Sequence, residues 1–174
     1  GTISVPNATF ANLGVLIDSL NTYGLSGALT VNVTAAQTPP VSTTPVVNGY
    51  QLGSATLNAS MSSTKTLTFN GGGNVITGYV GTRTTTSTIG STGNVDAFFA
   101  IRGTDYVTIN NFIFTDPASN TTTTTAMEAG VAMFNLSSAS GAMDGCQNIN
   151  VTNCTFNLQN ISTYSYCIWA SNYM

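Results

Sequence analysis

Two stretches of alternating apolar and polar residues, 105–114 and 147–156, carry similar side chains in the same order. In each stretch the alternation is interrupted by an asparagine, Asn111 in the first and Asn153 in the second. Alternation with a period of two predicts a β-strand with one buried face. Asparagine tolerates the left-handed backbone conformation that a tight corner requires. Each stretch therefore predicts two short strands joined at a corner.

The two stretches align without a gap at a constant step of 42 residues, and this register pairs like with like: Val107 with Ile149, Ile109 with Val151, Phe112 with Cys154 and Phe114 with Phe156. A repeat in one register predicts a solenoid, in which each turn of chain stacks on the previous one. The same step makes Arg102 equivalent to Asp144. We therefore expect these two to form an outward-facing ion pair on neighbouring rungs, and Asn111 and Asn153 to form a ladder at the corner.

The remaining pattern has the same alternating character. Further short strands are predicted at 28–33, 67–69, 75–77, 98–101, 130–136 and 166–170. Stretches rich in threonine, serine and glycine, which predict loops, occupy 81–95, 116–127 and 157–164. This order gives about three strands per rung, with a long loop leaving each rung from the same corner. The fold class predicted is all-β.

Apolar residues at helical spacing predict one amphipathic α-helix over about residues 9–22, with Thr9 as its N-cap and Gly24 beyond its end. The apolar positions are Phe10, Leu13, Leu16, Ile17 and Leu20. We expect this helix to cover the open end of the first rung, where strand edges and core would otherwise meet water. The sequence thus predicts a single domain over 1–174, with an N-terminal cap at 1–27 and stacked rungs at 28–174.

Composition narrows the class of protein. Only 5% of the residues are charged, against about 25% in an ordinary soluble domain. The net charge is −3 and there are three basic residues, which argues against binding to nucleic acid. There is no run of about 18 apolar residues, so no membrane-spanning segment is predicted. Because the chain begins at Gly1 and ends soon after a predicted strand, we expect it to be the front part of a longer, processed protein.

The order of the motifs resembles a known architecture. Gly27-Ala-Leu-Thr-Val-Asn-Val33 follows the helix, and then come Leu67-Thr-Phe69, Gly103-Thr-Asp-Tyr-Val-Thr-Ile109 and Asn153-Cys-Thr-Phe156. This series is similar to the N-terminal region of large cell-surface and secreted proteins of Bacteroidota, many of them exported by the type IX route. The resemblance implies a right-handed parallel β-helix of the pectate-lyase-like kind and an extracellular or cell-surface location.

Candidate catalytic chemistry is sparse. Enzymes of the pectate-lyase-like architecture use clustered carboxylates, and the acids of this chain are Asp18, Asp96, Asp105, Asp116, Glu128 and Asp144. On the 42-residue register no two of them share a ladder position, so paired carboxylates for acid–base work are not predicted. The chain has no histidine, and its cysteines show no metal-ligand spacing. We expect no catalytic residues, cofactor or metal here, and leave open whether Cys146, Cys154 and Cys167 form a disulfide.

Aromatic residues gather near the end of the chain, at Tyr164, Tyr166, Trp169 and Tyr173. They could stack on sugar rings, although packing against a neighbouring rung is the simpler interpretation. The function expected is that of a non-catalytic, adhesin-like or structural protein. Its loops would contact a glycan, a surface or another protein subunit. The alternative is the N-terminal part of a polysaccharide lyase or glycoside hydrolase whose active site lies outside these residues.

Overall fold

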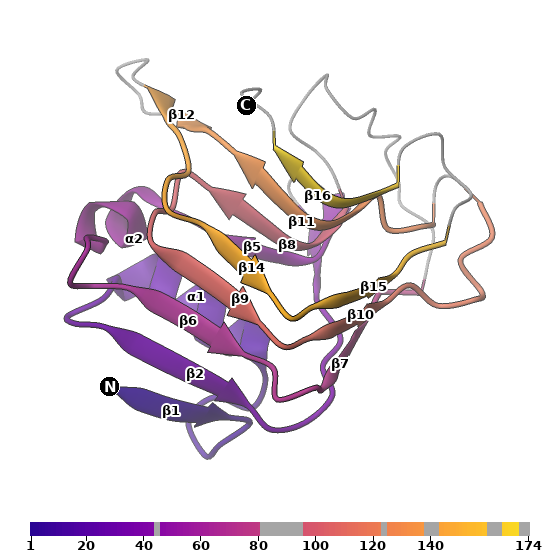
Figure 1. Ribbon diagram of the computed structural model, residues 1–174, viewed down its shortest axis with the longest axis horizontal. Helices are drawn as coiled ribbons and strands as arrows, with labels where there is room; N and C mark the ends of the chain where they lie inside the picture. The colour runs from indigo at the N-terminus through magenta and orange to yellow at the C-terminus, as the bar shows by residue number, and fades with distance from the viewer. Residues whose placement is uncertain (44–45, 81–95, 123–124, 138–142, 160–164, 171–174) are drawn as a thin grey trace.

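Short strands in parallel sheets, accompanied by two helices, make up the protein in the computed structural model (Figure 1). The structure describes residues 1–43, 46–80, 96–122, 125–137, 143–159 and 165–170. The first sheet contains β1 (Thr2–Val5), β2 (Leu29–Val33), β6 (Leu67–Asn70), β9 (Val107–Asn110) and β14 (Asn150–Thr152). The second contains β7 (Val75–Thr77), β10 (Ile113–Thr115) and β15 (Thr155–Asn157). The third contains β5 (Tyr50–Leu52), β8 (Ala97–Arg102), β11 (Ala129–Phe134) and β16 (Tyr166–Ala170).

The chain visits the three sheets in a constant order. β6, β7 and β8 are followed by β9, β10 and β11, and these by β14, β15 and β16, and within each sheet the neighbours are parallel. We call each such set of three strands a rung. The 42-residue register is confirmed in two sheets, where Val151 pairs with Ile109 and Phe156 with Phe114. The step differs elsewhere, because the connections between strands vary in length while the strands stay aligned.

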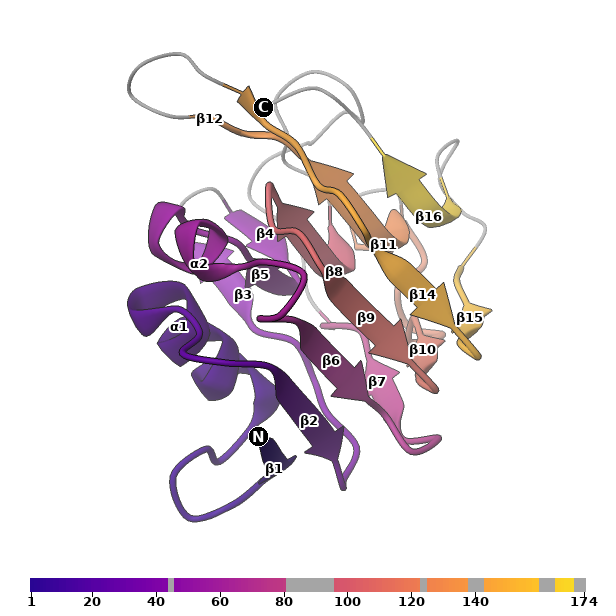
Figure 2. The ribbon, with the colours of Figure 1, turned by 60° about the vertical axis from the view of Figure 1, so that its left-hand side comes forward.

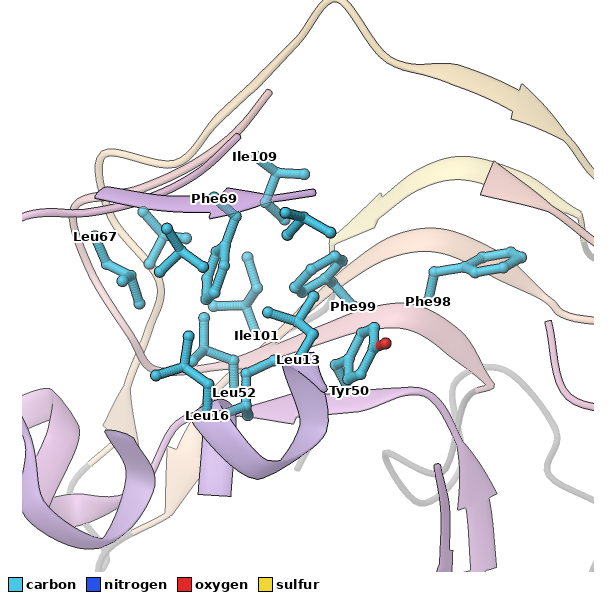
Figure 3. Close-up of a cluster of buried hydrophobic side chains, with 14 of the residues drawn as sticks. Leu13, Leu16, Tyr50, Leu52, Leu67, Phe69, Phe98, Phe99, Ile101 and Ile109 are labelled. Carbon is cyan, nitrogen blue, oxygen red and sulfur yellow. The ribbon is translucent and has the colours of Figure 1, made fainter. Parts of the chain in front are cut away.

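An aromatic cluster lies at the centre of the core (Figure 3). The Phe99 ring centroid is 5.2 Å from that of Tyr50, 5.4 Å from that of Phe69 and 6.0 Å from that of Phe112. All four side chains are almost completely buried. Burying one side chain of this size stabilises a fold by about 1.5–3 kcal/mol. Because the four come from three different rungs, this cluster ties the rungs together.

A ladder of amides runs along the outer face of the first sheet. Asn70 Nδ2 donates to Asn32 Oδ1 at 3.3 Å, and Asn110 Nδ2 donates to Asn70 Oδ1 at 3.3 Å. The predicted corner asparagines have the expected backbone, with φ of 57° at Asn111 and 54° at Asn153. Their side chains do not form the ladder, however, since Asn153 Nδ2 donates to Asn110 Oδ1 at 2.9 Å. The amide ladder therefore lies one residue before the corner.

Helix α1 (Leu13–Tyr23) confirms the predicted amphipathic helix but begins later than expected. Asn12 rather than Thr9 is the N-cap, because its side chain accepts a hydrogen bond from the Val15 amide at 3.0 Å. The buried face consists of Leu13, Gly14, Leu16, Ile17 and Leu20. Phe10 lies before the helix and is only partly buried against the core. The helix packs beside β5, below the third sheet (Figures 1 and 2).

Three further elements were not predicted. Helix α2 (Ala55–Ser60) follows β5, and its six residues are too few to show a clear periodicity. Two antiparallel hairpins join β3 (Val41–Thr43) to β4 (Val46–Asn48) and β12 (Leu136–Ser137) to β13 (Met143–Asp144). The α2 segment and the β12–β13 hairpin leave the corner between the third and first sheets. The expectation that every insertion leaves from one corner is therefore wrong.

The predicted equivalence of Arg102 and Asp144 is also wrong. Arg102 pairs in register with Phe134, and its guanidinium carbon lies 5.0 Å from the centroid of the Phe134 ring. Asp144 instead lies in the β12–β13 hairpin, where its carboxylate accepts a hydrogen bond from Asn58 Nδ2 at 3.1 Å. The inserted hairpin interrupts the repeat at this point. The register that holds from β9 onward therefore does not extend back to Arg102.

Candidate functional site

Three long connections leave the molecule at the corner between the second and third sheets. They join β7 to β8, β10 to β11 and β15 to β16, one on each successive rung (Figure 1). We call this region the loop corner, and define it by the described residues 78–80, 96, 116–122, 125–128, 158–159 and 165. The expected loop at 81–95 lies outside the described residues except for its two bases. Parallel stacking places the three pairs of loop bases in a row along the molecule.

Asp116 organises this corner from directly after β10. Its side chain is 2% exposed. Its two carboxylate oxygens accept hydrogen bonds from Asn120 Nδ2 at 2.6 Å and from the Met127 amide at 3.0 Å. These bonds bring together the beginning and the end of the loop that joins β10 to β11. The carboxylate therefore fixes the base of this loop.

Further hydrogen bonds join this loop to those on the neighbouring rungs. Asn120 Nδ2 also donates to the Tyr79 carbonyl at 3.0 Å, which connects it to the rung before. Gln159 Nε2 donates to the Asp116 carbonyl at 3.2 Å, and Ser165 Oγ donates to the Gln159 carbonyl at 3.2 Å. The bases of all three loops thus form one continuous chain of hydrogen bonds, which we call the loop-base network.

A second pair of acids lies in the same corner and corrects a prediction. Ala97 pairs with Ala129 in register, so Asp96 and Glu128, one residue before them, occupy equivalent positions on adjacent rungs. The Asp96 amide donates to Glu128 Oε2 at 2.8 Å, and the Glu128 amide donates to the Asp96 carbonyl at 3.0 Å. The statement that no two acids share a ladder position is therefore wrong. The two side chains are 0% and 3% exposed, so a polymeric substrate has no access to them.

Burial raises the pKa of the Asp116 carboxyl, although hydrogen bonds from Asn120, Met127 and Gln159 act in the opposite direction. Desolvation outweighs these bonds because the group is taken almost completely out of water. Within the described ranges, no group of three histidine, cysteine or acidic side chains is arranged to hold a metal ion. The acids of the loop corner therefore act as hydrogen-bond acceptors for the backbone and for Asn120.

The predicted aromatic group is only partly described, because Tyr164 and Tyr173 lie outside the described residues. Trp169 is half-buried and packs edge to face on Phe134, with ring centroids 5.2 Å apart. This contact matches the packing interpretation. Tyr166 is 38% exposed. Tyr79, which the sequence analysis did not single out, is also 38% exposed and lies at the base of the first loop. Tyr79 and Tyr166 are thus partly exposed aromatic residues at the two outer loop bases.

The three cysteines are free thiols, which answers the disulfide question for this structure. Cys146 Sγ donates to the Ile101 and Phe134 carbonyls, each at 3.4 Å. Burial raises the pKa of the Cys146 and Cys154 thiols, which makes both poor nucleophiles. Cys167 is exposed on β16. The two partly buried cysteines therefore act as small core side chains, as predicted for Cys154.

An open hollow of about 320 Å³ lies at the other end of the molecule, between α1 and the first sheet. Its apolar lining includes Ile3, Phe10, Leu16, Leu20 and Leu25. Its lining residues include no carboxylate, histidine or cysteine. The hollow therefore has the character of an incompletely filled seam beside the helix, without groups for acid–base chemistry.

Comparison with known proteins finds no matching family model, no matching curated protein and no matching solved structure. The functional argument therefore depends on the geometry of this chain. Among the described residues, none of the helices is both long and apolar enough to cross a lipid bilayer.

Proposed function

We propose that this chain is part of a right-handed parallel β-helix whose role is to present loops to a neutral polysaccharide. The fold proposal is supported by the constant order in which the chain visits three parallel sheets. The resemblance to Bacteroidota surface proteins supports an exported protein at the cell surface or outside the cell, with type IX secretion as the proposed route. In this role the β-helix is a rigid, non-catalytic scaffold of the adhesin type.

The observation that carries this proposal is the loop-base network. Loops that only connect strands need no hydrogen bonds between successive rungs, whereas a composite binding surface requires its loops to be held at fixed spacing. Asn120 and Gln159 supply that spacing by connecting the loop on the β10 rung to the bases on the rungs before and after it. A surface whose loop bases are fixed in advance loses less conformational entropy when a ligand binds.

A polysaccharide without charge is the best chemical match among glycan, surface and protein partners. The described loop residues between Asp116 and Glu128 are uncharged, and the exposed ones include Ala118, Ser119 and Thr121. Hydroxyl groups and the partly exposed rings of Tyr79 and Tyr166 suit sugar hydroxyls and sugar faces. A polysaccharide lyase or glycoside hydrolase site would need accessible paired carboxylates, and the burial of Asp96 and Glu128 does not favour that alternative here.

The test is binding of the chain to an array of neutral and acidic polysaccharides, followed by two matched variants. Thr121→Glu places a charge on an exposed loop residue, and Thr2→Glu places the same charge on an exposed residue of β1, away from the loop corner. We expect binding to a neutral polysaccharide that Thr121→Glu weakens and Thr2→Glu leaves unchanged. Absence of binding to every polysaccharide, or equal loss in both variants, would show that the loops are not a glycan surface.

A further inference from the structure

The last rung exposes apolar side chains that the preceding rung buries. Ile168 is 46% exposed, whereas its register partner Val131 is fully buried. Val151 and Phe156 are half-buried, although their partners Ile109 and Phe114 are fully buried. We call the surface formed by β14, β15 and β16 the open end. It lies at the end of the stack farthest from β1 (Figure 2).

The open end also presents strand edges. Within the described part of the chain, β14, β15 and β16 are each the last strand of their sheet. Proteins normally protect such edges with charged residues, proline or a covering segment. The sequences of the three strands, Asn-Val-Thr, Thr-Phe-Asn and Tyr-Cys-Ile-Trp-Ala, contain no charged residue and no proline. The edges of these three strands therefore lack the usual features that prevent pairing.

The opposite end differs, because α1 occupies the place below β5. Its residues Leu13, Leu16, Ile17 and Leu20 are at most 5% exposed. A helix in this position offers no strand edge to pair with β16, so a head-to-tail stack could not continue the third sheet. A tail-to-tail arrangement brings equivalent edges together, and such a contact is self-complementary and closed.

We propose that the open end is an interface between two copies of this chain, joined tail to tail about a two-fold axis. Strands related by such an axis across an edge run antiparallel, so the contact extends each stack with antiparallel pairing between the copies. Ile168, Val151 and Phe156 of each copy become buried. The absence of charged residues from the three strands allows this burial without desolvating a charge. This interface is independent of the loop corner and of the proposed glycan binding.

Sedimentation equilibrium of the 174-residue chain over a wide concentration range tests the proposal. We expect a reversible dimer, with twice the monomer mass of 18.0 kDa. Ile168→Asp places a charge in the interface and should raise the dimer dissociation constant by about tenfold or more. Val15→Asp is the matched control, because Val15 is 43% exposed on α1 at the other end, and it should leave the dissociation constant unchanged.

Circular dichroism and melting of each variant ensure that a change in mass reflects association and not unfolding. Ile168→Leu, which retains an apolar side chain, should remain dimeric. A wild-type chain that stays monomeric at every concentration would overturn the proposal. So would larger open-ended assemblies that Val15→Asp abolishes, since these would show that a head-to-tail contact is used instead.

Discussion

Replacing Asp116 with alanine should destabilise the fold much more than its surface-loop position suggests. The substitution leaves the Met127 amide and one Asn120 amide proton without their acceptor in a buried site. A buried donor that loses its partner costs about 1–3 kcal/mol. Two such donors give an expected loss of about 2–5 kcal/mol in the free energy of unfolding. Asp18→Ala, the same change on an exposed residue of α1, should lie within about 0.5 kcal/mol of wild type.

The pH dependence of this difference provides a second check. Burial raises the pKa of Asp116 above its unfolded value of 3.8, so the folded state holds the proton more tightly than the unfolded state. The contribution of such a group to stability is fully present below the unfolded pKa and is lost as the pH rises through the folded pKa. The stability difference between wild type and Asp116→Ala should therefore be larger at about pH 3 than at about pH 7.

Urea unfolding followed by tryptophan fluorescence measures both quantities. The chain has a single tryptophan, Trp169, which packs on Phe134 beside the loop-bearing rungs and so reports on the fold. The Asp116→Asn variant retains one oxygen acceptor and turns an amide toward a donor, so its loss should be smaller than that of alanine. A loss for Asp116→Ala no greater than that for Asp18→Ala would refute the role of the loop-base network. A difference that grows with pH would refute the assigned effect of burial.

Two further predictions concern the corner and the cap. Asn111→Ala should cost about 1–2 kcal/mol in urea unfolding, because alanine tolerates the left-handed backbone poorly, whereas Asn111→Gly should be close to neutral. Equal losses in the two variants would assign the effect to the lost asparagine side chain and not to the backbone. Leu13→Asp should place a charge in the core and cause aggregation, measured by light scattering, whereas Val15→Asp should not. A monomeric Leu13→Asp variant with unchanged melting would contradict the capping role of α1.

Short-range patterns predicted the strands well, because alternation and corner residues are local properties. Val151 pairs with Ile109 as expected, since no insertion separates these strands from the corner at Asn111. The Arg102–Asp144 equivalence failed because the β12–β13 hairpin lengthens one connection between the repeats. A register inferred from one part of a rung therefore holds only until the next insertion.

The candidate site was harder to predict for a physical reason. Asp96 and Glu128 are equivalent through the pairing of β8 with β11, whose step is shorter than 42 residues. A search at the 42-residue step could not align them. The loop-base network was missed because Asn120 and Gln159 bond mainly to backbone carbonyls, which leave no complementary side chain in the sequence. Acids close to loop ends on successive rungs are the one signal that could have indicated this corner.

The stacking of rungs has a mechanical consequence. Because β1 and β16 lie at opposite ends of the stack (Figure 1), a force that pulls these ends apart acts across the strands, along the direction of the hydrogen bonds between rungs. Bonds loaded in this way separate one after another, unlike the simultaneous shear of strands pulled along their length. Each separated rung of 42 residues would release about 140 Å of extended chain. A scaffold of this kind would yield to tension in steps, and the aromatic cluster around Phe99 would set the most resistant of them.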